Sequence, residues 1–267
     1  MNLGDGARLV ASRVTAGILL LAERPAAIGA ALRWTRFSLT SFRMVDDLRR
    51  QGVLPATVID VGANVGQFAC AALWLLRPRW VHAFEPSPDA LTALRRDLGA
   101  EPGVVIHAVA LGAVSGELPF HVNAHSHSSS LLPLSEAHRI AFPDATEVAE
   151  VNVPVRTLDE ELASVELPEP ILLKLDVQGY ERWVLDGGRG TLSRANWVIL
   201  EASFRPLYEG EPGFLDIVGY MAARGFRLLR PVGWLVAPAT GEILQCDVLF
   251  ERTADRVRTA DRVQGRS

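Results

Sequence analysis

The amino-acid sequence predicts an α/β fold in which helices cover both faces of a doubly wound, mostly parallel sheet. From residue 55 onward, short apolar runs alternate with helical stretches, and this order is typical of parallel sheets. The runs are almost continuously apolar, as expected for strands that are buried on both faces. A glycine-containing turn also joins the first run to the first helix, and in open parallel sheets such turns border the ligand site.

The strands of this sheet are predicted from the apolar runs. They are expected at residues 57–61, 80–84, 104–109, 171–175, 197–200 and 248–250. Between residues 115 and 155 the alternation stops, and segments 115–122 and 151–155 are expected to be short strands around a polar loop.

Helices are predicted between these strands, each with a residue type that commonly begins or ends one. They are expected at residues 64–77, 87–99, from 157 onward, 180–187 and 212–225. Asn64 is expected to cap the first of them and Ser87 the second. Thr157 and Glu160 have the spacing of a capping box, in which each side chain binds the other residue's backbone N–H.

Three segments are expected along the chain. Residues 1–54 form an N-terminal helical extension, residues 55–252 the main domain, and residues 253–267 a charged, flexible tail. The apolar run at residues 14–22 is shorter than the ~20 residues that span a bilayer. No transmembrane helix and no signal peptide are therefore expected.

Composition narrows the class of protein. Lys and Arg total 27 against 31 Asp and Glu, a formal net charge of −4, which argues against a protein that coats nucleic acid or anionic lipid. The two cysteines, Cys70 and Cys246, have no metal-binding spacing and are expected to be reduced core thiols. This favours a reducing, cytoplasmic compartment. Homo-oligomerisation is possible on this sequence.

The turn after the first predicted strand is the most informative segment. Gly62 and Gly66 allow a ligand to approach the backbone, and the helix that follows offers free N–H groups. Positions 64 and 67 are not glycine and no G-K-[ST] follows, so neither a dinucleotide fingerprint nor a P-loop is present. Glu85 ends the next strand, where a carboxylate can accept hydrogen bonds from both hydroxyls of a ribose.

A set of motifs then identifies a resemblance. Within about residues 55–250 the chain contains, in this order, the motifs D-V-G-A-N-x-G-Q, F-E-P, A-L-G, S-S-L and K-L-D-V-Q-G-Y-E. This set of motifs resembles that of the FkbM family of S-adenosyl-L-methionine-dependent methyltransferases. The resemblance implies a Rossmann-like class I methyltransferase fold, with a seven-stranded sheet whose last strand, here residues 246–252, is antiparallel. It also implies a cofactor site: the amino-acid end at Asp60, Gly62, Ala63, Asn64 and Gly66, the ribose at Glu85, the wall at Pro86 and Ser87, and the adenine at Ala110 and Leu111.

Methyl transfer requires an aligned acceptor and, for a hydroxyl acceptor, removal of a proton. Three residues are candidates for the catalytic side. Asp176 ends the fourth strand of the sheet, Glu201 follows the fifth, and His127 lies in the polar loop beside S-S-L. His121 and His125 accompany His127, but no carboxylate is near them in sequence, so no metal site is expected.

The sequence therefore favours an enzyme that methylates a hydroxyl group of a sugar, a glycan or a natural-product small molecule. Two alternatives stay open at this stage. An NAD-dependent oxidoreductase has the same topology and the same ribose carboxylate. A non-catalytic module would keep the fold but bind a partner through its N-terminal helices.

Overall fold

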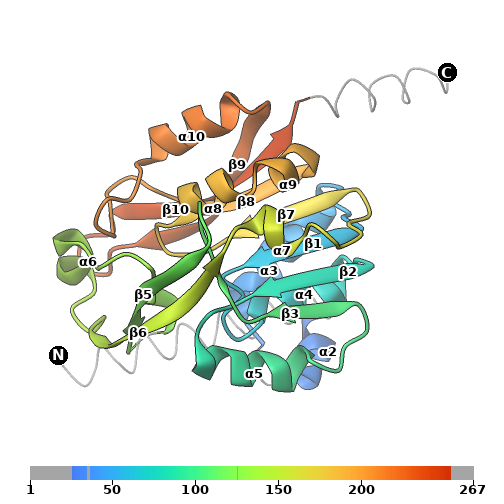
Figure 1. The fold of residues 1–267 in the computed structure, drawn as a ribbon, viewed down its shortest axis with the longest axis horizontal. Helices are drawn as coiled ribbons and strands as arrows, with labels where there is room; N and C mark the ends of the chain where they lie inside the picture. The colour runs from blue at the N-terminus through green and yellow to red at the C-terminus, as the bar shows by residue number, and fades with distance from the viewer. Residues whose placement is uncertain (1–25, 35–36, 125, 254–267) are drawn as a thin grey trace.

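The computed structural model describes residues 26–34, 37–124 and 126–253. At its centre is a seven-stranded sheet in the order β3-β2-β1-β7-β8-β10-β9 (Figure 1). The strands are β1 (Thr57–Val61), β2 (Trp80–Phe84), β3 (Val104–His107), β7 (Ile171–Leu175), β8 (Trp197–Ser203), β9 (Phe226–Val236) and β10 (Ile243–Arg252). Strand β10 is antiparallel to both neighbours, and the remaining pairs are parallel. The predicted fold class, including the antiparallel last strand, is confirmed.

Helices cover both faces of this sheet (Figure 1). On one face lie α2 (Ala26–Arg33), α3 (Leu39–Arg50), α4 (Gln67–Leu75) and α5 (Pro88–Leu98). On the other lie α7 (Leu158–Glu161), α8 (Glu181–Gly187), α9 (Arg189–Arg194) and α10 (Phe214–Ala222). Successive strand residues alternate between the faces: Val58 packs with α4, whereas Ile59 packs with α8.

A second, three-stranded sheet stands beside the main one, in the order β4-β6-β5. Its strands are β4 (Ala110–Leu111), β5 (Gly116–Asn123) and β6 (Glu147–Arg156), with η1 (Ser126–Ser128) and α6 (Glu136–Ala141) between β5 and β6. Phe120 on β5 and Val155 on β6 belong to its small apolar core. The predicted strands at 115–122 and 151–155 are thus confirmed, although β6 begins earlier than expected.

The strands differ from the sequence analysis at two places. The expected strand 104–109 is divided, because β3 ends at His107 and Ala110 then pairs with Val155 of the small sheet. Strand β9 was not predicted at all. It contains Pro231 and Gly233 and is irregularly paired with β10, so its sequence lacks the continuous apolar run that marked the other strands.

Two predicted helix caps also differ. Helix α4 begins at Gln67 with Gly66 as its N-cap, whereas Asn64 has φ 49° and belongs to the preceding turn. The Thr157 hydroxyl does accept from the Glu160 N–H at 3.2 Å. The reciprocal half of the capping box is replaced by Ser115, whose hydroxyl accepts from the Thr157 N–H and donates to the Glu160 carboxylate.

The N-terminal extension is described only in part. Helices α2 and α3 lie within the predicted helical extension of residues 1–54, and both share a buried core with α4. Residues 1–25 of that extension and nearly all of the predicted tail lie outside the described residues. Cys70 and Cys246 are buried and unbridged, as predicted. Among the described residues, no helix is long and apolar enough to cross a membrane.

Candidate active site

The turn after β1 lies at the carboxyl edge of the sheet and is held against β7. Gly62 has φ 78°, and a Cβ atom there would lie 1.9 Å from the backbone oxygen of Asp176. Only glycine fits both the left-handed conformation and this close approach. The turn therefore brings the end of β1 and the end of β7 together.

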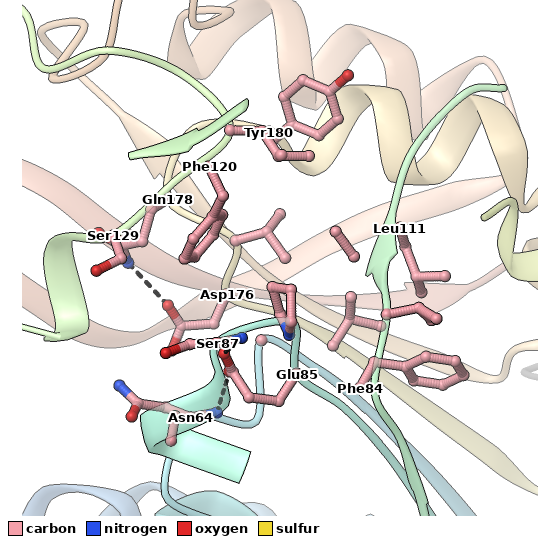
Figure 2. Close-up of a pocket in the computed structure, with 18 of the residues that line it drawn as sticks. Asn64, Phe84, Glu85, Ser87, Leu111, Phe120, Ser129, Asp176, Gln178 and Tyr180 are labelled. Atoms are coloured by element: carbon pink, nitrogen blue, oxygen red, sulfur yellow. Dashed lines mark hydrogen bonds between the residues drawn. The ribbon is translucent and has the colours of Figure 1, made fainter. Parts of the chain in front are cut away.

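Glu85, which follows β2, is fixed by this turn. One of its oxygens accepts from the Asn64 N–H at 2.8 Å, and the other accepts from the Ser87 N–H at 2.8 Å (Figure 2). The residue is only 6% exposed. Burial raises the pKa of Glu85 to about 7, although the two backbone N–H groups oppose this shift.

A first cavity, with an empty volume of about 700 Å³ that includes space open to solvent, lies beside Glu85. Seven residues that sequence analysis assigned to the cofactor line it: Gly62, Asn64, Glu85, Pro86, Ser87, Ala110 and Leu111. Apolar side chains form much of the remaining wall, including Phe84, Phe120 and Tyr180 (Figure 2). The cavity thus has a polar end at Glu85 and Asp176 and a largely apolar remainder.

Asp60 and Gly66 were also assigned to the cofactor from the sequence, but neither residue lines this cavity. Asp60 is fully buried within β1, and its carboxylate lies 3.3 Å from the Lys174 ammonium on the neighbouring strand. A Cβ atom at Gly66 would lie within 2.9 Å of Leu94 and Leu98 of α5. These two motif residues thus serve the sheet and helix packing. Ala63 lines a second cavity instead.

That second cavity has an empty volume of about 1510 Å³ and adjoins the first. It extends towards α3, α6, β9 and β10, and Lys174, Glu201 and Asp247 line it. Five residues border both cavities: Gly62, Asn64, His127, Asp176 and Gln178. Two molecules, one bound in each cavity, would therefore meet at this shared wall.

A buried hydrogen-bond network holds Asp176 in the shared wall. Its carboxylate lies 3.1 Å from the Lys174 ammonium and accepts from the Gln178 amide at 2.8 Å (Figure 2). The same amide nitrogen donates to Glu201 at 2.6 Å. The amide oxygen of Gln178 accepts from the Tyr208 hydroxyl at 2.7 Å, which fixes the orientation of the amide.

The two acids of this network differ in protonation. Burial alone raises the pKa of Asp176, but the Lys174 charge and the Gln178 hydrogen bond outweigh it and hold that pKa below its usual value. Burial and the neighbouring Asp176 and Asp247 charges raise the pKa of Glu201 well above its usual value. At neutral pH Asp176 is therefore ionised, whereas Glu201 holds its proton more readily than an ordinary glutamate.

His127 reaches the shared wall from η1. Its Nδ1 lies 3.2 Å from the side-chain nitrogen of Asn64. The structure thus brings two of the three predicted catalytic candidates, His127 and Asp176, to the junction of the cavities. Glu201 lines only the second cavity and is linked to Asp176 by two hydrogen bonds, both donated by the Gln178 amide.

Several residues that shape the site were not assigned to it from the sequence. Gln178 and Lys174 appear in the sequence analysis only as letters of a motif, and Tyr208 does not appear in it. The pairing of Lys174 with Asp60 depends on the β1–β7 register. Gln245 and Asp247 lie on β10, far along the chain from every motif.

The described residues contain one cluster with the ligand types and spacing of a metal site. His121 Nδ1 lies 3.0 Å from Glu147 and 3.7 Å from Glu150 across the β5–β6 pair. The cluster lies outside both cavities. Sequence analysis missed these carboxylates because strand pairing, not sequence proximity, brings them to His121. His125 lies outside the described residues.

The sheet order, with β10 antiparallel between β8 and β9, is that of a Rossmann-like class I methyltransferase fold. The methyltransferase FkbM domain matches residues 60–228, and the chain belongs to this family. The family match decides against the NAD-dependent oxidoreductase that the sequence left open.

The relatives of the chain include two curated methyltransferases. It is 29% identical to the hexuronic acid methyltransferase AglP of Haloferax volcanii over 65% of this chain and 71% of that protein. It is 28% identical to the 2-O-methyltransferase NoeI of Sinorhizobium fredii over 58% of this chain and 66% of that protein. The crystal structure of a methyltransferase FkbM from Methylobacillus flagellatus KT is 16% identical, with a TM-score of 0.47 over 88% of this chain and 60% of that one.

Proposed function

We propose that this enzyme transfers the methyl group of S-adenosylmethionine to a hydroxyl group of a sugar, either free or within a glycan or glycosylated natural product. The names of the two relatives, one acting on a hexuronic acid and one a 2-O-methyltransferase, support a sugar hydroxyl as acceptor. The junction of the two cavities carries the proposal, because methyl transfer needs donor and acceptor to meet at one point.

The residues of the first cavity fit S-adenosylmethionine. Glu85 keeps lone pairs free on both oxygens after accepting its two backbone N–H groups, so it can accept from both ribose hydroxyls. Among the described residues that line this cavity there is no lysine or arginine, which suits a cofactor without phosphate. The carboxylate of Asp176 favours a cation at the shared wall. When bound there, the sulfonium group supplies an electrophilic methyl group.

On the acceptor side, we assign the uptake of the hydroxyl proton to Asp176. It is ionised and borders both cavities. A hydroxyl oxygen becomes strongly acidic as it gains a methyl group, so a carboxylate of low pKa is a sufficient base. His127 accepts from the Asn64 amide at Nδ1, which leaves Nε2–H as a donor that positions the acceptor oxygen.

The first experiment is isothermal titration of the purified full-length chain with S-adenosylhomocysteine, with NAD in a parallel titration. Micromolar binding of S-adenosylhomocysteine alone is expected. Transfer of a labelled methyl group from S-adenosylmethionine to a panel of monosaccharides and glycosides then tests the acceptor. Cofactor binding without a methylated sugar in the panel would overturn the sugar assignment, and absence of binding would overturn the cofactor site.

A further inference from the structure

The wall of the second cavity contains polar side chains that have no partner within the protein. Gln245 is 2% exposed, and its amide nitrogen has no hydrogen-bond partner among the described residues. His138 is 3% exposed, and neither ring nitrogen has a partner within the described chain. Both residues line the cavity. Buried polar groups without a partner are costly, so this wall is suited to a ligand that supplies the missing hydrogen bonds.

Asp247 adds an acceptor to the same wall. It lies two residues after Gln245 in β10, and it is paired with Gly233 of β9. A Cβ atom at Gly233 would lie 2.1 Å from the Asp247 carboxylate, so glycine there leaves room for it. No hydrogen bond or ion pair joins the Asp247 side chain to another described residue. The wall therefore offers an unpaired donor, the Gln245 amide nitrogen, and an unpaired acceptor, the Asp247 carboxylate. A ligand hydroxyl group can accept from the first and donate to the second.

The charge of the cavity restricts which hydroxylated ligand fits. Three carboxyl residues line it, namely Asp176, Glu201 and Asp247. Among its described lining residues, Lys174 is the one lysine or arginine. The Lys174 ammonium already lies within 3.3 Å of both Asp60 and Asp176. A ligand carboxylate would thus meet the Asp176 and Asp247 carboxylates, and the described lining residues include no cation that is free to receive it. Like charges at such range are strongly unfavourable.

From these observations, and resting on the proposed function, we infer that the second cavity selects sugars without a carboxylate. Gln245 and His138 bind ring hydroxyls, and Asp247 rejects acidic sugars. Trp234, half-exposed on β9 and lining the same cavity, suits the apolar face of a pyranose ring. The acceptor is a neutral or amino sugar, in contrast to the hexuronic acid in the name of one relative.

The test uses acceptor pairs that differ only at C6: methyl glucoside against methyl glucuronide, and methyl galactoside against methyl galacturonide. The rate constant kcat/KM for labelled methyl transfer is measured at pH 8 for each member. We expect the neutral member to be preferred by at least about tenfold, and Asp247→Asn to reduce that preference by about tenfold. Glu117→Gln removes one carboxylate on exposed β5 and is expected to leave the preference unchanged.

A second variant tests the hydroxyl contacts. Gln245→Leu keeps the side-chain size but removes the donor, so it is expected to raise KM for the neutral sugar about fivefold. The affinity for S-adenosylhomocysteine should stay within a factor of two, since Gln245 does not line the first cavity. A loss of affinity for both ligands would indicate a merely structural role and overturn the assignment of Gln245.

The outcomes separate this inference from the proposed function. Equal use of both members, preference for the uronide, or an unchanged preference in Asp247→Asn would overturn the inference and leave sugar methylation standing. If S-adenosylhomocysteine binds but no member of either pair is methylated, the sugar acceptor of the proposed function fails, and the inference fails with it.

Discussion

Replacing Glu85 by glutamine tests the cofactor site most directly. The wild-type carboxylate accepts one backbone N–H on each oxygen and keeps about two further lone pairs for ribose hydroxyls. In Glu85→Gln one oxygen becomes an NH₂ group, which cannot accept from either a backbone N–H or a hydroxyl. The variant thus loses one charge-assisted hydrogen bond to the ribose. The second ribose hydrogen bond is kept but becomes weaker, because its acceptor is a neutral amide oxygen instead of a carboxylate.

The magnitude follows from the usual strength of such bonds. A hydrogen bond to a charged group contributes about 1.5–3 kcal/mol, and about 1.4 kcal/mol changes Kd tenfold. Titration calorimetry with S-adenosylhomocysteine at pH 8 should therefore show a Kd about 10 to 100 times higher in Glu85→Gln. Asp89→Asn, which removes an exposed carboxylate from the first turn of α5, is the matched control. A Kd within a factor of two of wild type, with an unchanged melting temperature, would refute Glu85 as the ribose ligand.

The pH dependence of binding gives an independent check. Burial raises the pKa of Glu85 to about 7, and only the ionised form accepts hydrogen bonds on both oxygens. Affinity for S-adenosylhomocysteine should rise as pH increases from 6 to 8, whereas Glu85→Gln should be nearly flat. Stability changes in the opposite sense, because an acid with a raised folded-state pKa stabilises the fold at low pH. That contribution, about 3 kcal/mol, is lost as pH rises from about 4.5 through 7.

Three further changes test the rest of the site. Asp176→Asn should lower kcat by roughly 10²–10⁴-fold at saturating S-adenosylmethionine if Asp176 is the base, and a decrease below threefold would exclude that role. Lys174→Met leaves the buried Asp60 and Asp176 carboxylates without their cation; urea denaturation should show a loss of about 3–5 kcal/mol, and a loss under 1 kcal/mol would contradict the pairing. Gly62→Ala forces a methyl group against the Asp176 carbonyl and should prevent folding as judged by circular dichroism, whereas Gly219→Ala, with open space around its Cβ, should fold normally.

The parts of the fold that were predictable depend on local patterns. The central strands are apolar on both faces, so β1, β2 and β7 were located to the residue. The position of Glu85 at the end of β2 was equally visible, because parallel strands end at one sheet edge. Strand β9 could not be seen, since Pro231 and Gly233 interrupt its pattern and it is stabilised by pairing with β10.

The second cavity depends on register and long-range packing, which no local pattern encodes. Gln245 is read from the sequence as an ordinary polar residue in an apolar strand. It becomes a wall residue because β10 runs antiparallel beside β8, which places Gln245 opposite Ser203 and Asp247 opposite Glu201. His138 reaches the same wall from α6, a helix that interrupts the predicted alternation. The lining of the first cavity could therefore be predicted largely from motifs, whereas that of the second cavity required the structure.

The register also explains why neighbouring acids at one sheet edge differ in chemistry. Asp60 is directly opposite Lys174 in the β1–β7 pair, and both side chains point to the α4 face, where Phe68 lies 5.2 Å from the ammonium. Asp176, the first residue after β7, shares that ammonium and stays ionised. Asp247 lies two strands away on β10, where burial and the Asp176 charge outweigh the Lys174 charge and raise its pKa to about 6. Asp60 thus helps to hold the Lys174 ammonium beside Asp176 at the shared wall. A motif residue that lies outside both cavities can in this way affect the charge of the site.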